Sequence, residues 1–235
     1  MKIIWKDECE IAHKATGFQW AVVSEFWVTI IAAIACYLLR ETSAYFVTPV
    51  YFNLLNFEDS QKTRAAKADK LADKTFSMIY HVIIIIYGYI VLSETEYLPA
   101  MLGGSGSNKF TKFYSEFPCI TSSYEESLRT YYLVTLGYRV FKTCLLMYQW
   151  CRNEHRSDFI EMFLHHTMTL TLYAFSFYMS FVKIGSVIMY LHDLVEPLLN
   201  SSKIFAEVKA DKLVTMSSGI LLWLIWGWTR IYVFP

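Results

Sequence analysis

The chain has 235 residues, of which 55% are hydrophobic and 18% charged, whereas soluble domains usually carry about a quarter charged residues. Its 21 basic and 21 acidic side chains cancel, so there is no general attraction to nucleic acid and we expect no nucleic-acid partner. This composition excludes an ordinary soluble domain and predicts an integral membrane protein, an all-α polytopic helix bundle.

Segments long enough to cross a bilayer recur along the sequence. A membrane-spanning helix needs about 20 mainly apolar residues, and about six transmembrane helices are predicted, near residues 18–39, 76–92, 127–150, 159–181, 184–205 and 213–234. Residues 1–17 are polar and are predicted to be an N-terminal extramembrane segment rather than a signal peptide.

The first span is followed by two segments of different character. Residues 45–57 are apolar but short and contain Pro49, so we expect an interfacial or re-entrant segment that closes the region 18–57. Residues 58–75 are charged and alanine-rich and are predicted to be a surface linker helix leading into the second span. Basic residues favour the side of residues 40–74, which the positive-inside rule places in the cytosol or matrix.

The two spans at 159–181 and 184–205 each carry a polar stripe. An ionisable side chain near the bilayer centre costs roughly 2.5–3.5 kcal/mol, so such groups indicate a functional site by default. At about 100° per residue, each set falls within roughly one third of the helix circumference. The first set is Asp158, His165, His166, Thr169, Tyr173, Ser176 and Ser180, and the second is His192, Asp193, Glu196, Asn200 and Lys203.

Facing one another, these stripes would line a polar cleft with apolar walls, and Pro197 is expected to kink the second helix. A histidine beside a carboxylate is a general base, which predicts a base pair of His192 with Asp193. His165 or His166 would then take the acyl group or stabilise an oxyanion. The set therefore points to acyl transfer between lipids.

Several alternatives stay open at this point. The stripes can serve as hydrogen-bonding contacts between helices, or the cleft can belong to a channel, a transporter or a metal-dependent lipid oxidase. The remaining histidines, His13, His81 and His155, are interpreted as structural or surface groups.

The run HHTMTLTLYAFSFYMSFVKIGSVIMYLHDLVEPLLNSSKIF, from His165 to Phe205, resembles the signature of TLC-domain proteins, specifically the ceramide synthases. The resemblance extends from about Lys70 to the terminal TRIYVFP and implies a TLC-like domain over 76–235. It implies N-acylation of a sphingoid base with fatty acyl-CoA as co-substrate, and no metal or resident cofactor. It assigns catalytic weight to His165, His166, His192, Asp193 and Glu196. Substrate contacts are expected from Thr169, Tyr173, Ser176, Ser180, Lys183, Asn200 and Lys203.

The sequence also departs from that signature. Glu196 stands where ceramide synthases have a second Asp, and their following Glu is Asn200 here. Their Asn is Ser180, and their Arg is Lys183. Pro197 resembles more distant TLC proteins, and the chain ends at Pro235 where ceramide synthases continue. A second hypothesis is therefore a catalytically degenerate lipid-binding or structural subunit of a larger membrane complex.

We expect membrane lipids as partners and a homo- or hetero-oligomer or larger complex. The endoplasmic reticulum is the expected membrane, with the mitochondrial inner membrane as the alternative.

Overall fold

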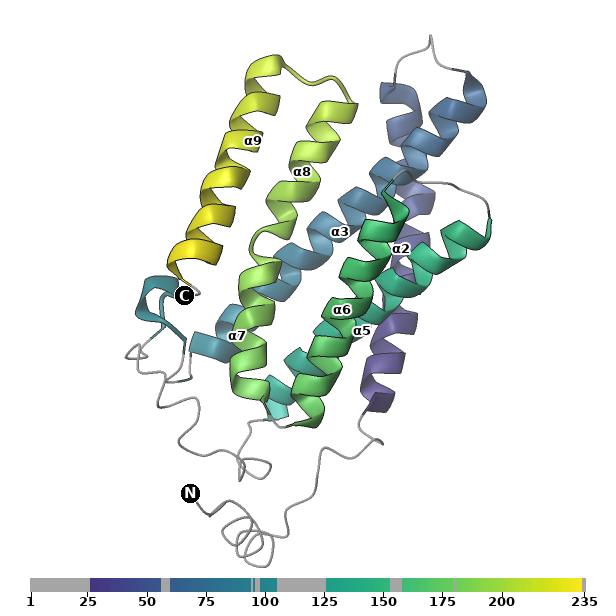
Figure 1. The fold of residues 1–235 in the computed structure, drawn as a ribbon. Helices are drawn as coiled ribbons and strands as arrows, with labels where there is room; N and C mark the ends of the chain where they lie inside the picture. Colours follow the sequence, from purple (N-terminus) through teal and green to yellow (C-terminus); the bar gives the residue numbers. More distant parts are fainter. Residues whose placement is uncertain are drawn as a thin grey trace, which may run out of the picture. The chain divides into compact units, whose positions relative to one another are not determined.

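The computed structural model describes residues 26–55, 60–93, 95, 98–104, 126–152, 158–179 and 181–233. The elements that these residues form are all helical, with no β-strand among them, which confirms the all-α prediction (Figure 1). The helices are α2 (Phe26–Leu54), α3 (Gln61–Ser93), α5 (Glu126–Cys151), α6 (Phe159–Tyr178), α7 (Val182–Asp193), α8 (Glu196–Glu207) and α9 (Lys212–Gly227), with a 3-10 turn η2 (Ala100–Leu102) and a π-turn η3 (Trp228–Tyr232). The predictions for residues 1–17 and Ser180 lie outside the described part of the chain.

Among the described helices, α2 and α3 are the two that are long and apolar enough to cross a membrane. With 29 and 33 residues, they extend over about 43 and 50 Å, which exceeds the roughly 30 Å hydrocarbon layer. The other predicted spans coincide with α5, with α6, with α7 and α8 together, and with α9 and η3.

The region after the first span is continuous with it. α2 continues through Pro49 to Leu54, so the chain does not reverse there as a re-entrant segment would, and an interfacial placement of residues 45–54 stays a prediction. The end of α2 is held by packing, because Tyr51 and Phe52 lie against a buried cluster of Leu55, Ala68, Leu71 and Ile204. α3 includes most of the predicted linker at 58–75 in one continuous helix.

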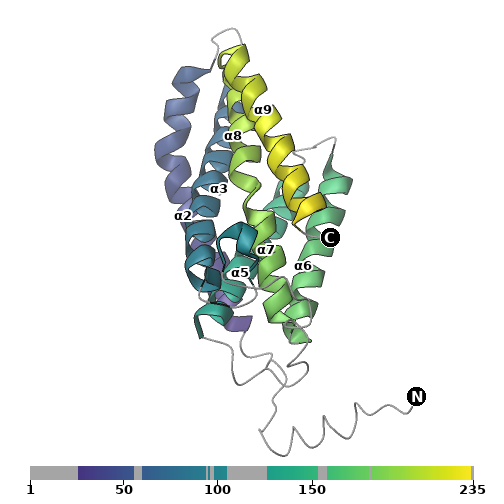
Figure 2. The same ribbon diagram turned by 90° about the vertical axis from the view of Figure 1, so that its left-hand side faces the viewer.

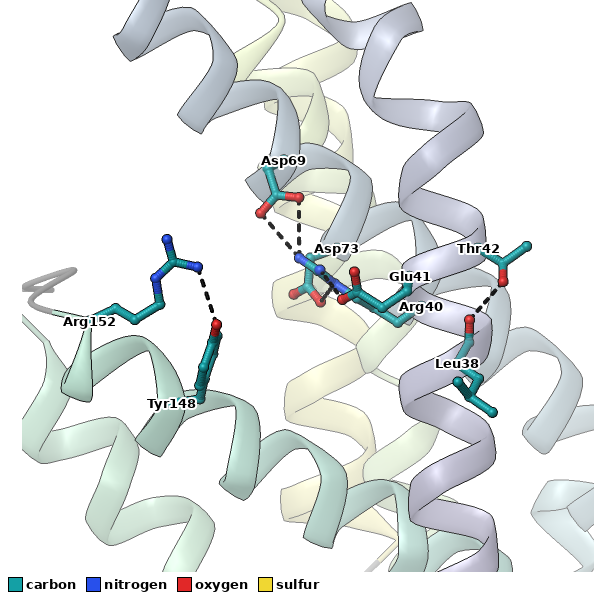
Figure 3. Close-up of polar contacts among 8 residues, drawn as sticks. All are labelled: Leu38, Arg40, Glu41, Thr42, Asp69, Asp73, Tyr148 and Arg152. Atoms are coloured by element: carbon teal, nitrogen blue, oxygen red, sulfur yellow. Dashed lines mark hydrogen bonds and ion pairs between the residues drawn. The ribbon is translucent and has the colours of Figure 1, made fainter.

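Arg40 lies within α2, just beyond the span predicted at residues 18–39, and only 8% of its surface is exposed. Its Nη2 donates to both carboxylate oxygens of Asp69 at 3.3 and 3.1 Å, and its Nη1 donates to Glu41 Oε1 at 2.6 Å. Its Nε lies 3.6 Å from Asp73 Oδ1. Figure 3 shows the guanidinium pointing from α2 toward the two α3 carboxylates. The paired charge is thereby accommodated inside a continuous helix.

The chain forms two compact units. Unit 1 comprises residues 1–36 and 91–188, and unit 2 comprises residues 37–90 and 189–235. In unit 1, α5 packs on α6. In unit 2, α8 and α9 run side by side (Figures 1 and 2), and Ile204 of α8 joins the buried cluster with α3.

Within unit 1, the first turns of α2 cross α5 so closely that the backbones of the two helices approach each other. A Cβ on Gly137 would lie 2.6 Å from Ala32 Cβ and 2.7 Å from the Thr29 carbonyl oxygen. Thr29 Oγ1 donates to the Leu133 carbonyl oxygen at 3.3 Å. Small residues commonly permit this kind of close crossing between membrane helices.

We therefore expect Gly137→Ala to lower stability by about 1–3 kcal/mol, because the added methyl group meets backbone rather than a movable side chain. Thermal unfolding in detergent micelles would measure the loss. Gly219→Ala is the matched control, since a Cβ on that α9 glycine has no neighbour within 4 Å. Because alanine has a higher helix propensity than glycine, this variant should be as stable as the wild type or more stable. Equal losses in both variants would contradict the proposed crossing.

Candidate functional site

The strings Leu191-His192-Asp193 (LHD) and Val195-Glu196-Pro197 (VEP) lie at a break between two helices. α7 ends at Asp193, and α8 begins at Glu196 with Pro197 in its first turn. Proline has no N–H to donate to the carbonyl of Asp193 four residues earlier, and its ring crowds that carbonyl. The predicted kink at Pro197 is confirmed, and it divides the span predicted at 184–205 into two helices.

Asp193 has 0% of its surface exposed, and its Oδ1 lies 3.7 Å from Nε2 of His81 on α3. His81 is itself 1% exposed, and its Nδ1 lies 2.6 Å from the Ser77 carbonyl oxygen. A carbonyl oxygen only accepts hydrogen bonds, so Nδ1 carries the hydrogen in this contact. The sequence interpretation of His81 as a structural or surface group missed its contact with the motif.

His192, one residue before Asp193, has a partner of its own. Its Nδ1 lies 3.1 Å from Nη1 of Arg230 in η3. A guanidinium only donates hydrogen bonds, so Nδ1 accepts, and the proton of the neutral ring is on Nε2. Neighbouring residues project about 100° apart on a helix. The structure thus places His81 beside Asp193 and Arg230 beside His192, and the base pair of His192 with Asp193 stays a prediction.

On α8, Asn200 and Glu196 form a second polar pair. Asn200 is 8% exposed, and its Nδ2 donates to the Glu196 carbonyl oxygen at 2.9 Å and to Glu196 Oε2 at 3.4 Å. The amide of Asn200 is therefore engaged in holding the Glu196 side chain. Lys203, predicted to share this polar stripe, is exposed on α8.

In unit 1, the buried face of α6 is formed by Tyr173 and Phe177. Counting back seven residues, or about two turns, places half-buried His166 in line with Tyr173, while His165 is exposed. The two imidazole rings meet edge-on with centroids 5.7 Å apart. Thr169 Oγ1 donates to the His165 carbonyl oxygen at 2.8 Å, which directs its hydroxyl toward its own helix.

Other residues predicted to contact substrate also serve helix packing. The Tyr173 carbonyl accepts a hydrogen bond from Tyr132 of α5 at 3.0 Å, and Ser176 Oγ donates to the Phe181 carbonyl oxygen at 3.2 Å. The half-buried Lys183 accepts a bond from Ser186 Oγ through its carbonyl. The Tyr132–Tyr173 bond joins two helices, as the helix-contact alternative expects, whereas the other two bonds are local, at the end of α6 and within α7.

The structure therefore brings the predicted residues together in separate sets. Unit 2 joins Asp193 to His81, His192 to Arg230 and Glu196 to Asn200, and unit 1 joins His165 to His166. That the two stripes face one another across one cleft stays a prediction. Within the described ranges, no group of three or more His, Cys, Asp or Glu side chains could hold a metal ion.

Two residues of this site, His81 and Arg230, were missed by the sequence reasoning. His81 precedes the run VIIII in one predicted span, and Arg230 lies in the last span. An ionisable group inside an apolar span is a functional-site candidate by default. That rule, applied to all six spans rather than to the two with polar stripes, would have selected both residues.

The Arg230 contact leads to a test of its own. Arg230→Leu removes the donor that fixes the His192 tautomer, so we expect kcat of any reaction at this site to fall about 10²-fold, because a misplaced reacting group costs about that much. Arg230→Lys retains a cation and should recover part of the loss. Steady-state kinetics per folded protein would measure both, and equal losses in the two variants would argue against a tautomer-fixing role.

Comparison with known proteins identifies the family. Residues 70–235 match the TLC domain. The chain is 23% identical to ceramide synthase hyl-2 of Caenorhabditis elegans over 99% of its own length and 68% of that protein. It is 31% identical to ceramide synthase LOH2 of Arabidopsis thaliana over 46% of this chain and 36% of that protein. It is 24% identical to sphingosine N-acyltransferase lag1 of Schizosaccharomyces pombe, over 70% of this chain and 38% of that protein.

The chain thus spans about two thirds of the length of hyl-2 and less than half of the other two relatives. The TLC match covers well over half of the chain and contains both histidine strings, the break at Pro197 and Arg230. This protein belongs to the TLC-domain family and is a ceramide-synthase-like integral membrane protein.

Proposed function

We propose that the chain is an N-acyltransferase that moves a fatty acyl group from acyl-CoA to the amine of a sphingoid base in the endoplasmic reticulum membrane. The observation that carries this proposal concerns two consecutive residues at the end of α7. His192 contacts Arg230, and Asp193 lies beside His81. The names of the relatives, ceramide synthase and sphingosine N-acyltransferase, supply the reaction class.

In this reaction the amine nitrogen forms a bond to the thioester carbonyl carbon, and the carbon–sulfur bond breaks. The amine loses a proton, and coenzyme A leaves as the thiol, so that proton is accounted for overall. His165 is exposed on α6, and His166 is half-buried. One of them can take the acyl group as a nucleophile or receive the amine proton.

His192 has a different role in this proposal. Because Arg230 donates to its Nδ1, the neutral ring carries its hydrogen on Nε2, and in this proposal that N–H donates toward the oxygen of the thioester carbonyl. A preorganised donor of this type stabilises the negative charge that develops there. Asp193, with no exposed surface, acts through its neighbours rather than by touching the substrate.

The test is amide formation by the purified protein, together with whatever co-purifies, from labelled long-chain acyl-CoA and sphinganine. We expect labelled ceramide-type amide in the wild type and its loss in His192→Ala. The matched control is Trp223→Ala, because Trp223 is 72% exposed on α9 and lies outside the site. Folded wild-type protein that forms no amide under these conditions would contradict the proposal.

The alternative is a TLC-fold subunit that binds lipid or supports a larger membrane complex without turnover. Asn200 favours it, because this position carries an acid in the ceramide-synthase signature and its amide here is bound to Glu196. Co-purified lipid in a stable multi-subunit assembly, with no amide product, is the result that this alternative predicts.

A further inference from the structure

We propose that His81 is a positioning residue that fixes the Asp193 carboxylate at the end of α7 for acyl transfer. This inference rests on the proposed function. It is carried by the 3.7 Å approach of His81 Nε2 to Asp193 Oδ1, with both side chains 1% exposed. His81 lies more than a hundred residues before Asp193 in the chain, outside the histidine strings of the motif.

The position of Asp193 calls for a nearby cation. A helix carries partial negative charge at its C-terminus and partial positive charge at its N-terminus. Asp193 is the last residue of α7, where an anion is disfavoured, whereas Glu196 lies in the first turn of α8, where an anion is favoured. The buried carboxylate of Asp193 therefore depends more on an outside partner than the carboxylate of Glu196 does.

The hydrogen bond on the other side of the ring orients His81 for this task. Its Nδ1–H donates to the Ser77 carbonyl oxygen, one turn earlier in α3. In that orientation, Nε2 is the atom turned toward Asp193. The contact is attractive only when a proton lies on Nε2 or on the carboxyl group, because otherwise two acceptors would face one another. The pair thus holds a proton between α3 and the end of α7.

This pair has a consequence for catalysis because of its place in the chain. His192 is the residue next to Asp193, and its own orientation is set by Arg230. Two contacts from different elements, α3 and η3, therefore hold two consecutive residues at the end of α7. A buried ion pair is weak evidence for a gain in stability, since apolar residues of similar volume often do as well. A role in holding the motif explains why the pair occurs in this apolar span.

Two amide substitutions separate this role from a general packing role. In His81→Gln the terminal amide nitrogen reaches the place of Nε2 and can still donate to Asp193. In His81→Asn the amide nitrogen reaches only the place of Nδ1, which keeps the Ser77 contact and loses Asp193. Both side chains are polar and differ by one methylene group, so their effects on folding should be similar.

The experiment measures kcat and KM for amide formation per folded protein in both variants, each alone and combined with Asp193→Asn. We expect His81→Asn to lower kcat about 10²-fold with little change in KM, and His81→Gln to recover most of that loss. In the Asp193→Asn background the two variants should have the same kcat, because His81 then has no carboxylate to hold.

Each other outcome has a separate meaning. A kcat for His81→Asn within twofold of wild type would overturn the positioning role and leave the proposed function standing. The same Asn-to-Gln difference in the Asp193→Asn background would also overturn it, since His81 would then act independently of Asp193. Absence of amide from the wild-type protein would instead count against the proposed function, and the role of His81 in that reaction would fall with it.

Discussion

Replacing His165 or His166 by alanine is expected to lower kcat for amide formation by roughly 10²–10⁴-fold, the range for loss of a catalytic acid, base or nucleophile. Stability should change little at His165, because it is exposed and such surface truncations usually cost about 0.5 kcal/mol or less. For the half-buried His166, kcat is compared per folded protein. Met168→Ala is the matched control, since Met168 is 69% exposed on the same helix and should leave kcat unchanged.

The same variants test whether the two polar stripes act on one reaction. If His166 and His192 serve one transition state, His166→Ala combined with His192→Ala should be about as slow as the worse single variant, because residues that act as a unit are not additive. Independent, multiplicative losses would mean that the stripes do not share a reaction. A wild-type rate for both single histidine variants of α6 would remove that helix from the mechanism.

The sequence was sufficient for those features that depend on local pattern. Apolar runs of about 20 residues predicted a helical membrane protein, and the missing N–H of Pro197 predicted a kink in the span at 184–205. The string HH…HD identified the TLC family. Each of these signals lies within one helix or one short string, so no knowledge of distant contacts was needed.

The features that the sequence did not reveal depend on partners far apart in the chain. The first span was predicted to end before Arg40, because Asp69, 29 residues away, is not recognisable as the partner of Arg40 from sequence. His192 and Arg230 are separated by 38 residues. Without those contacts, a charged residue in an apolar span has no visible means of stabilisation.

Helical periodicity also placed the polar residues of each span within one arc of the helix surface. It did not show which edge of that arc is buried. On α6 the buried face is centred on Tyr173 and Phe177, so His165 is exposed at the other edge of the predicted stripe. On the next span, the break at residues 194–195 interrupts the helical phase. The prediction that His192 and Lys203 share one arc assumed a single continuous helix, and it therefore does not apply.

Asp193→Leu is expected to lower the free energy of unfolding by about 3–5 kcal/mol, because it leaves the proton-bearing ring of His81 buried without its carboxylate. The double variant His81→Leu with Asp193→Leu should recover most of that stability, since a buried ion pair replaced by apolar groups is often neutral or stabilising. Thermal and denaturant unfolding in detergent would measure both. Ile84→Leu, a shape change at another buried residue of α3, is the control for repacking and should cost less than about 1.5 kcal/mol.

Among the wild type, Asp193→Leu and the double variant, the order of kcat should differ from the order of stability. The double variant is expected to fold as well as the wild type and still form amide about 10²-fold more slowly or worse, because apolar side chains at both positions cannot orient the end of α7. Recovery of stability without recovery of kcat would show that the pair is retained for the reaction and not for the fold. A double variant with wild-type kcat would mean the reverse: Asp193 and His81 would then be a packing device, and catalysis would depend on His165, His166 and His192 alone.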